Sequence, residues 1–238
     1  MDTFSIEKPL RYYDQVYNSI REMIVKGTLK PGDSIYEARI ARELNISRSP
    51  VREAVRALEK EGLLEIDEKS RITVYKPTMK DIEDIYQCRI VLESLAASLT
   101  TRLATKLELE EIEDTLIKSS EYLEDYCEEK RDGLIKENAR FHDLIMKYSQ
   151  NKRLKKQLKD LKSLSHYYRV LNFQGENREW NVFNEHQEIF TQIVNRDQEK
   201  ACEAMQNHMK NDLIHLKEMF GTSNNLDKEN MPPFSRMV

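Results

Sequence analysis

The sequence predicts a mainly α-helical fold in two parts, an N-terminal winged helix-turn-helix and a C-terminal antiparallel all-helical bundle. Three observations lead to this prediction. Only 6 Gly and 6 Pro occur in 238 residues, and so few helix breakers favour long helices over many short strands. Apolar residues recur at helical spacing almost without interruption from Met79 to Phe220. Two short β-prone runs lie earlier, between Leu63 and Tyr75.

The N-terminal part opens with two expected helices. Residues 9–26 form an amphipathic pattern, because apolar side chains recur at every fourth position. Residues 36–44 form a short second helix, and Asn45 supplies the turn after it. The hydroxyl of Ser47 or Ser49 is expected to cap a third helix by accepting a hydrogen bond from its first turn.

The third helix buries a stripe made of Val51, Val55 and Leu58. The runs 63–66 and 72–75 then form a hairpin around a polar loop. Helix, helix-turn-helix and hairpin, in that order, make a winged helix-turn-helix.

The domain boundaries follow from these patterns. The sequence predicts a winged helix-turn-helix domain over residues 1–76 and a helical domain over 79–220, joined by Pro77 and Thr78. Six helices with short joints are expected in the second domain, which implies an antiparallel bundle. Residues 221–238 are polar and contain Pro, so they are expected to be a mobile tail.

Charge and cysteine content limit the function classes. Residues 1–78 hold 14 Lys and Arg against 13 Asp and Glu, whereas the remainder holds 24 against 29. A basic segment attached to an acidic remainder is typical of a DNA reader carried by a sensor domain. No signal peptide or membrane span is expected. Three unpaired cysteines indicate reduced, mostly buried thiols and a cytoplasmic location.

Arginines spaced by four residues identify a candidate DNA-reading face. Arg48, Arg52 and Arg56 project from one side of the third helix. Arginine in the first turn of such a helix can reach guanine in the major groove or clamp phosphates. The alternative is a solvated basic face, in which Arg52 pairs with Glu53 or Glu59. The helix-turn-helix spacing and the following hairpin favour DNA.

The run from Ile46 to Leu63 resembles the signature of the GntR family of transcriptional regulators, and so does the segment from Gly27 to Asp33. The resemblance implies DNA contacts from the recognition helix and from the tip of the wing. The wing lacks the glycine of many relatives. Ala38 stands where they often have a charged residue, so one phosphate contact is either missing or taken over by Arg39. The expected DNA-binding residues are Arg39, Ser47, Arg48, Ser49, Arg52, Arg56, Lys69, Ser70 and Arg71.

Four residues are candidate metal ligands: Asn138, His142, His186 and His208. Asn138 and His142 are four apart and share a helix face. From spacing alone, packed core histidines are the simpler interpretation. The motifs around these residues, and the segment 81–93, resemble the FCD effector domain of the FadR-like GntR branch. That resemblance implies a divalent metal, zinc or nickel, although many relatives have Asp where this chain has Asn138.

Arg89 and Tyr86 are candidate ligand-binding residues. A guanidinium in a bundle core needs an anionic partner and can bind a carboxylate with two parallel bonds. The competing interpretation is a salt bridge from Arg89 to Glu93, one turn further along. The resemblance favours a small organic acid as the effector.

The sequence therefore predicts a ligand-responsive regulator that binds operator double-stranded DNA as a homodimer, and neither an enzyme nor a membrane-associated protein. One alternative is a metal-dependent hydrolase with His142, His186 and His208 as ligands and Glu185 as base. Another is an architectural DNA-binding protein that senses nothing.

Overall fold

The structure, a computed structural model, describes residues 11–25, 27–124, 126–173 and 178–223. The chain divides into two compact units with a boundary between Lys76 and Pro77. Across the described ranges, no helix is both long and apolar enough to cross a membrane.

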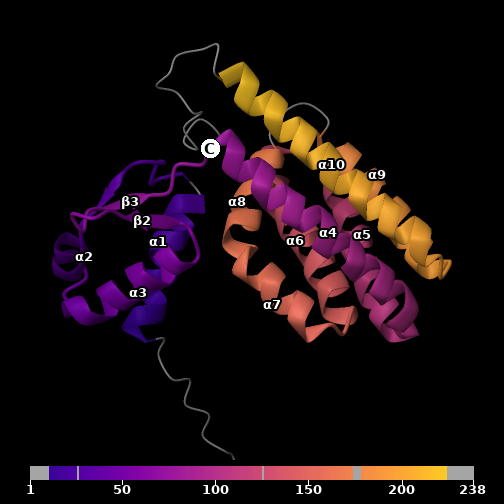
Figure 1. The fold of residues 1–238 in the computed structure, drawn as a ribbon, viewed down its shortest axis with the longest axis horizontal. Helices are drawn as coiled ribbons and strands as arrows, with labels where there is room; N and C mark the ends of the chain where they lie inside the picture. Colours follow the sequence, from indigo (N-terminus) through magenta and orange to yellow (C-terminus); the bar gives the residue numbers. More distant parts are fainter. Residues whose placement is uncertain (1–10, 26, 125, 174–177, 224–238) are drawn as a thin grey trace, which may run out of the picture. The chain divides into compact units, whose positions relative to one another are not determined.

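The N-terminal unit is three helices and a small sheet (Figure 1). Its elements are α1 (Tyr12–Val25), β1 (Ser34–Ile35), α2 (Glu37–Glu43), α3 (Arg48–Lys60), β2 (Leu64–Ile66) and β3 (Ile72–Val74). The strands run antiparallel in the order β1-β3-β2, with Ser34 opposite Thr73 and Leu64 opposite Val74. The core forms where α1 packs on α3, through the fully buried Val16, Val51 and Leu58.

Local chemistry explains most of this unit, and the structure corrects one prediction and adds one strand. Asn45 turns the chain between α2 and α3 with φ +51°, as its side-chain type allows. Ser47 is the N-cap of α3, but its hydroxyl caps no amide, so the predicted capping bond is wrong. Strand β1 was not predicted, because two residues are too short to show an alternating pattern.

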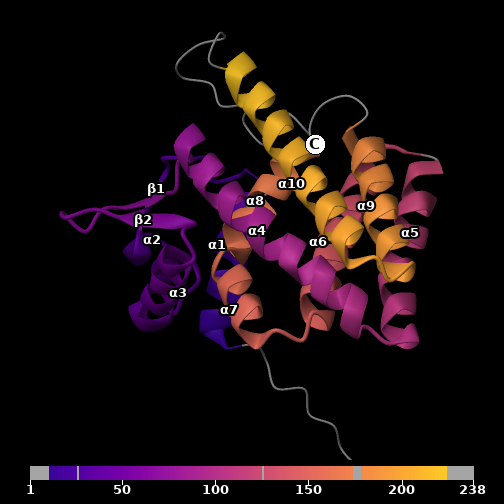
Figure 2. The same ribbon diagram turned by 45° about the vertical axis from the view of Figure 1, so that its right-hand side comes forward.

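The C-terminal unit is helical throughout its described part (Figure 2). Its helices are α4 (Met79–Leu103), α5 (Lys106–Glu124), α6 (Glu128–Tyr148), α7 (Lys152–Asp160), α8 (Lys162–Asn172), α9 (Arg178–Val194) and α10 (Gln198–Ser223). Helix α4 begins at a capping box in which Thr78 and Asp81 bond to each other's backbone amides. Helix α10 lies along α4, which is the most extensive helix pair of the unit.

The main core of this unit joins the facing sides of six helices. Phe141, Ile189, Met205 and Met209 lie at its centre, each 0% exposed. A second cluster packs Leu123 and Leu134 with neighbours from α8 and α9. The histidine-bearing stretches of α6, α9 and α10 run beside the main core, so side chains from these helices meet in its interior.

Three expectations for this unit were wrong. The described residues form seven helices rather than six, because the chain turns at Leu161 and separates α7 from α8. Helix α10 continues past Gly221 to Ser223, and the rest of the predicted tail, residues 224–238, lies outside the described residues. Cys88 and Cys127 are exposed and Cys202 is half-buried, so the thiols are not mostly buried.

Candidate metal centre and DNA-reading surface

Helix α3 has one buried face and one basic face. Val51, Ala54, Val55 and Leu58 are all 0% exposed. The opposite side presents four exposed side chains: Arg48, Ser49, Arg52 and Arg56. The 3.6-residue period separates the two faces, so hydrophobic packing of one holds the other outward.

The arginines of this face rest against acidic neighbours. Arg52 Nε lies 3.5 Å from Glu37 Oε2 on α2, so the expected alternative partners Glu53 and Glu59 are not the ones it uses. Arg56 Nη1 lies 3.0 Å from Glu59 Oε2. Both arginine side chains are more than 60% exposed, so these pairs are weak and an incoming phosphate or guanine can replace them.

Three other predicted DNA-binding residues lie nearby on the same unit. Arg39 on α2 is exposed and pairs with Glu43 at 2.7 Å. Ser47 is exposed at the N-cap of α3. Arg48 is exposed, and within the described part of the chain no ion pair holds it.

The wing loop is organised by one acidic residue. Asp67 Oδ1 accepts hydrogen bonds from the amides of Lys69 and Arg71, and its Oδ2 accepts one from Arg71 Nε at 2.6 Å. Ser70 takes the left-handed conformation, with φ +60°, at the tip. A serine therefore occupies the conformation usually adopted by glycine, and all three predicted wing residues are exposed.

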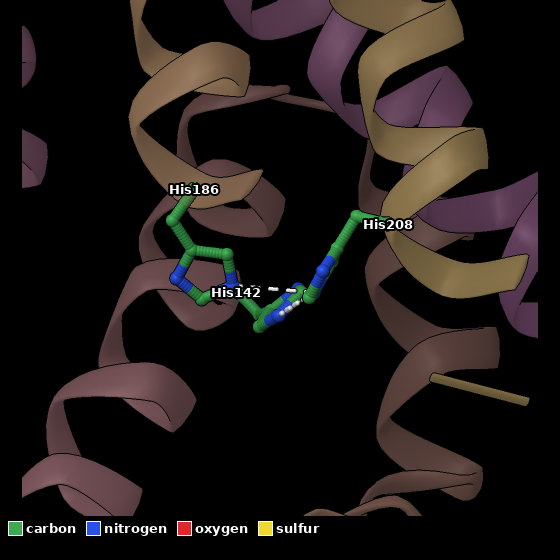
Figure 3. A group of neighbouring side chains, drawn as sticks. All are labelled: His142, His186 and His208. Carbon is green, nitrogen blue, oxygen red and sulfur yellow. Dashed lines mark hydrogen bonds between the residues drawn. The ribbon is translucent and has the colours of Figure 1, made fainter. Parts of the chain in front are cut away.

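Three helices bring three imidazoles together in the C-terminal unit. His142 on α6, His186 on α9 and His208 on α10 are 5%, 4% and 1% exposed. His208 Nε2 lies 3.2 Å from His186 Nε2 and 3.3 Å from His142 Nε2 (Figure 3). The three Nε2-bearing ring edges point to a common centre, as ligands around an ion do.

Two carboxylates determine which nitrogen faces that centre. Glu93 Oε2 lies 2.6 Å from His142 Nδ1, and Glu185 Oε2 lies 2.6 Å from His208 Nδ1. Each carboxylate favours a proton on Nδ1 and so leaves a lone pair on Nε2. Two lone pairs 3.3 Å apart repel each other, whereas a cation between them would attract both.

Burial keeps His142 and His186 neutral, which is the form that binds metal. Desolvation lowers the pKa of His142 to about 4, although Glu93 opposes this shift. Desolvation and the neighbouring His208 hold the pKa of His186 well below its usual value. Neither ring needs to lose a proton at neutral pH before it can donate to an ion.

Asn138 lies one helical turn before His142 on α6 and is 5% exposed. Its Oδ1 is buried and, within the described ranges, accepts no hydrogen bond. An unpaired buried carbonyl is costly, and a cation would satisfy it. The three imidazole nitrogens fit a divalent ion, and the amide oxygen of Asn138, one turn away from His142, is a candidate for a further ligand.

Arg89 forms the expected salt bridge with Glu93, yet it is not fully satisfied by it. Arg89 is 0% exposed and its Nε donates to Glu93 Oε1 at 2.7 Å. Both Nη atoms are buried without an acceptor among the described residues. The guanidinium stacks on Tyr86, 4.6 Å from the ring centre, and the buried Tyr86 hydroxyl is likewise unpaired there.

Sequence reasoning missed two further buried arginines. Arg169 on α8 is 6% exposed and lies 3.8 Å from Glu93 Oε2. Arg178 on α9 bonds to Asp212 on α10 and lies 3.3 Å from Glu185 Oε1. The apolar spacing of α8 and α9 indicates only that these helices pack in the core. The acidic partners of the two arginines can therefore be identified only from the folded structure.

A cavity of about 20 Å³ adjoins the histidine cluster. The charged and imidazole side chains of Glu93, His142, Asp143 and Arg169 line it, and so does Ser165. The cavity wall contains both His142, a candidate metal ligand, and the buried cation Arg169. A few polar groups that converge on one cavity are a common feature of small-molecule sites.

Comparison with known proteins agrees with the two units. Residues 12–74 match the family model described as bacterial regulatory proteins, gntR family, and residues 84–211 match the FCD domain. The chain belongs to the GntR family of transcriptional regulators. This GntR regulator binds DNA through its N-terminal unit, and its FCD domain is of a kind that responds to small molecules.

Relatives extend over nearly the whole chain. The HTH-type transcriptional regulator YdhC of Bacillus subtilis is 37% identical over 219 residues, which cover 92% of this chain and 97% of YdhC. The HTH-type transcriptional repressor RspR of Escherichia coli is 24% identical over 82% of this chain and 85% of its own. The structure of E. coli McbR/YncC has the same fold, with a TM-score of 0.71 and 21% identity over 89% of this chain and 99% of McbR.

These regulators are not enzymes, and the hydrolase alternative also fails on geometry. Glu185, its candidate base, is held by His208, Arg178 and Asn211. A general base must be available to a water molecule or a substrate. Glu185 instead orients an imidazole.

Proposed function

We propose that this GntR regulator binds a pseudo-palindromic operator as a homodimer and senses a small carboxylate at a divalent metal centre. The observation that carries the proposal is the convergence of three buried Nε2 atoms. Zinc with ligands at about 2.0–2.1 Å in a tetrahedron separates neighbouring nitrogens by about 3.3 Å. The Nε2 separations of 3.2 and 3.3 Å match that spacing.

His142, His186 and His208 would hold the ion, with Asn138 as an oxygen ligand. Zinc and nickel both accept imidazole nitrogen, and a neutral amide oxygen in place of a carboxylate leaves more positive charge on the centre. The bound ion would supply an electrophilic position for an anionic oxygen. Glu93 and Glu185 would keep two of the rings in the ligating tautomer.

Metal content tests this centre directly. Protein incubated with zinc and with nickel, then desalted, should retain about one ion per chain by elemental analysis. His186→Ala should abolish retention and the metal-dependent rise in melting temperature, because the ion binds only the folded state. His215→Ala is the matched control on α10 and should retain the ion. Wild-type protein without metal after both incubations rejects the centre.

Arg89 is the proposed carboxylate anchor, since its two unpaired Nη atoms match the two oxygens of one carboxylate. A screen of organic acids should find one that changes operator affinity about 5- to 150-fold, the range of typical allosteric coupling. Arg89→Gln should bind DNA without effector as the wild type does, but it should not respond to the acid. An equal response from wild type and variant rejects the anchor.

The exposed face of α3 and the wing are the proposed DNA contacts. A site selected from random duplex DNA should have two half-sites about one helical turn apart, as dimers of this motif require. Arg52→Ala should weaken binding to it by about 1–3 kcal/mol and relax the preference at one position. Lys60→Ala, at the far end of α3, is the control. A selected site without dyad symmetry, bound by one chain in sedimentation, rejects the dimer.

A further inference from the structure

Glu93 is shared by two buried guanidinium groups and one imidazole. Its Oε1 accepts the 2.7 Å bond from Arg89 Nε, and its Oε2 lies 2.6 Å from His142 Nδ1. Arg169 Nη2 approaches that same Oε2 from α8, but only to 3.8 Å. This one carboxylate is therefore shared by two buried guanidinium groups, and Asp143, which lines the adjacent cavity, is a further acidic neighbour of Arg169.

Several donors of these two arginines have no acceptor. Arg89 Nη1, Arg89 Nη2 and Arg169 Nε are all buried, and none has a hydrogen-bond partner in the described part of the chain. Leaving buried donors of a charged group unpaired is costly. The buried carboxylate of Asp212 does not relieve this, because it is already bonded to Arg178 and Asn172.

The two arginines also differ in how well they are neutralised. Burial disfavours the charge of both, but Glu93 and Tyr86 outweigh burial at Arg89 and raise its pKa. At Arg169 burial and the charge of Arg89 prevail over the attraction of Glu93 and Asp143 and lower the pKa. Arg169 lines the cavity next to His142, as Asp143 does, so its guanidinium group adjoins the space that a ligand would enter.

We propose that the effector is a short dicarboxylate, with one carboxylate on Arg89 and the second on Arg169. Both guanidinium groups contact opposite oxygens of the same Glu93 carboxylate, so their separation suits a diacid with few carbons between its ends. A monocarboxylate on Arg89 would leave Arg169 Nε without an acceptor among the described residues. This inference rests on the proposed function, because it assigns a second anchor within the same effector site.

The experiment compares acids that differ by one carboxylate. Full-length protein loaded with zinc is titrated calorimetrically, at constant ionic strength, with malonate, succinate and glutarate and with the monoacids of equal carbon number, propionate, butyrate and pentanoate. At least one diacid should bind 10-fold or more tightly than its matched monoacid. Equal affinities in all three pairs overturn the inference and leave carboxylate sensing by Arg89 intact.

Variants assign the preference to Arg169. Arg169→Gln should lose the 10-fold preference while its monoacid affinity stays within 2-fold of the wild type, and Arg169→Lys should restore part of the preference. A loss of both acids in equal measure from folded Arg169→Gln, checked by circular dichroism, overturns the assignment. Arg89→Gln should lose both acids. If no acid of either class binds wild-type protein, the carboxylate effector and this inference both fail.

Discussion

Glu93→Gln removes one negative charge from the ionic contacts of the helical unit while it preserves the size of the side chain. Arg89, which is 0% exposed, would then keep a buried charge without an ionised partner. Breaking a buried ion pair in this way costs about 3–5 kcal/mol. At about 2–4 °C per kcal/mol for a chain of this size, a loss of about 3 kcal/mol lowers the melting temperature by about 6–12 °C.

The same substitution should weaken zinc binding about 10- to 100-fold, because His142 loses the carboxylate that fixes its tautomer. Glu185→Gln is the matched control, since it makes the same change beside His208. The Glu185 side chain is 19% exposed and its partner Arg178 keeps Asp212, so we expect a stability loss of about 1 kcal/mol with a similar loss of zinc affinity.

Calorimetric melting of chelator-treated protein measures the first effect, and competition with a zinc-binding dye measures the second. Equal melting temperatures for the two variants would refute the idea that Glu93 neutralises a buried arginine. Unchanged zinc affinity in both variants would refute the tautomer argument.

Three substitutions test the scaffold, each by chemical denaturation. Ser70→Val should cost about 1 kcal/mol or more, because a β-branched residue is strained at φ +60°, whereas Ser70→Gly should be neutral or slightly stabilising. Thr78→Ala should cost about 1 kcal/mol through loss of the α4 capping box. Gly133→Ala places a Cβ 2.6 Å from the Tyr122 ring, so it should destabilise the wild type but stabilise Tyr122→Ala by about 1 kcal/mol through better helix propensity. Gly133→Ala effects that are equal in both backgrounds would contradict the steric argument.

The helices were predictable from sequence because burial imposes a 3.6-residue period on the side chains that form the core. The separation of α7 from α8 was not, since Leu154, Leu158, Leu161 and Leu164 keep that period across the turn. The Arg89–Glu93 pair was foreseeable because residues four apart share a helix face.

The rest of the site depends on contacts between helices. His142 on α6 and Arg169 on α8 both approach Glu93 on α4. These residues are far apart in the sequence, so no local sequence pattern predicts their contacts. The His208–Glu185 contact joins α10 to α9 in the same way. Family motifs in the sequence therefore indicated the candidate metal ligands. The carboxylates that orient these ligands, and the buried arginine near them, could be assigned only from the contacts between helices.

The small cavity beside Arg169 bears on the rate at which the proposed effector binds. A cavity of about 20 Å³ holds about one water molecule, so the proposed binding of an organic acid would require α7 or α8 to move away from α6. Helix displacements of this kind take microseconds to milliseconds, and association slows in proportion to the fraction of open molecules. A bound acid would need the same movement in order to leave. We therefore expect both the binding and the release of the proposed effector to be limited by the rate of this helix displacement.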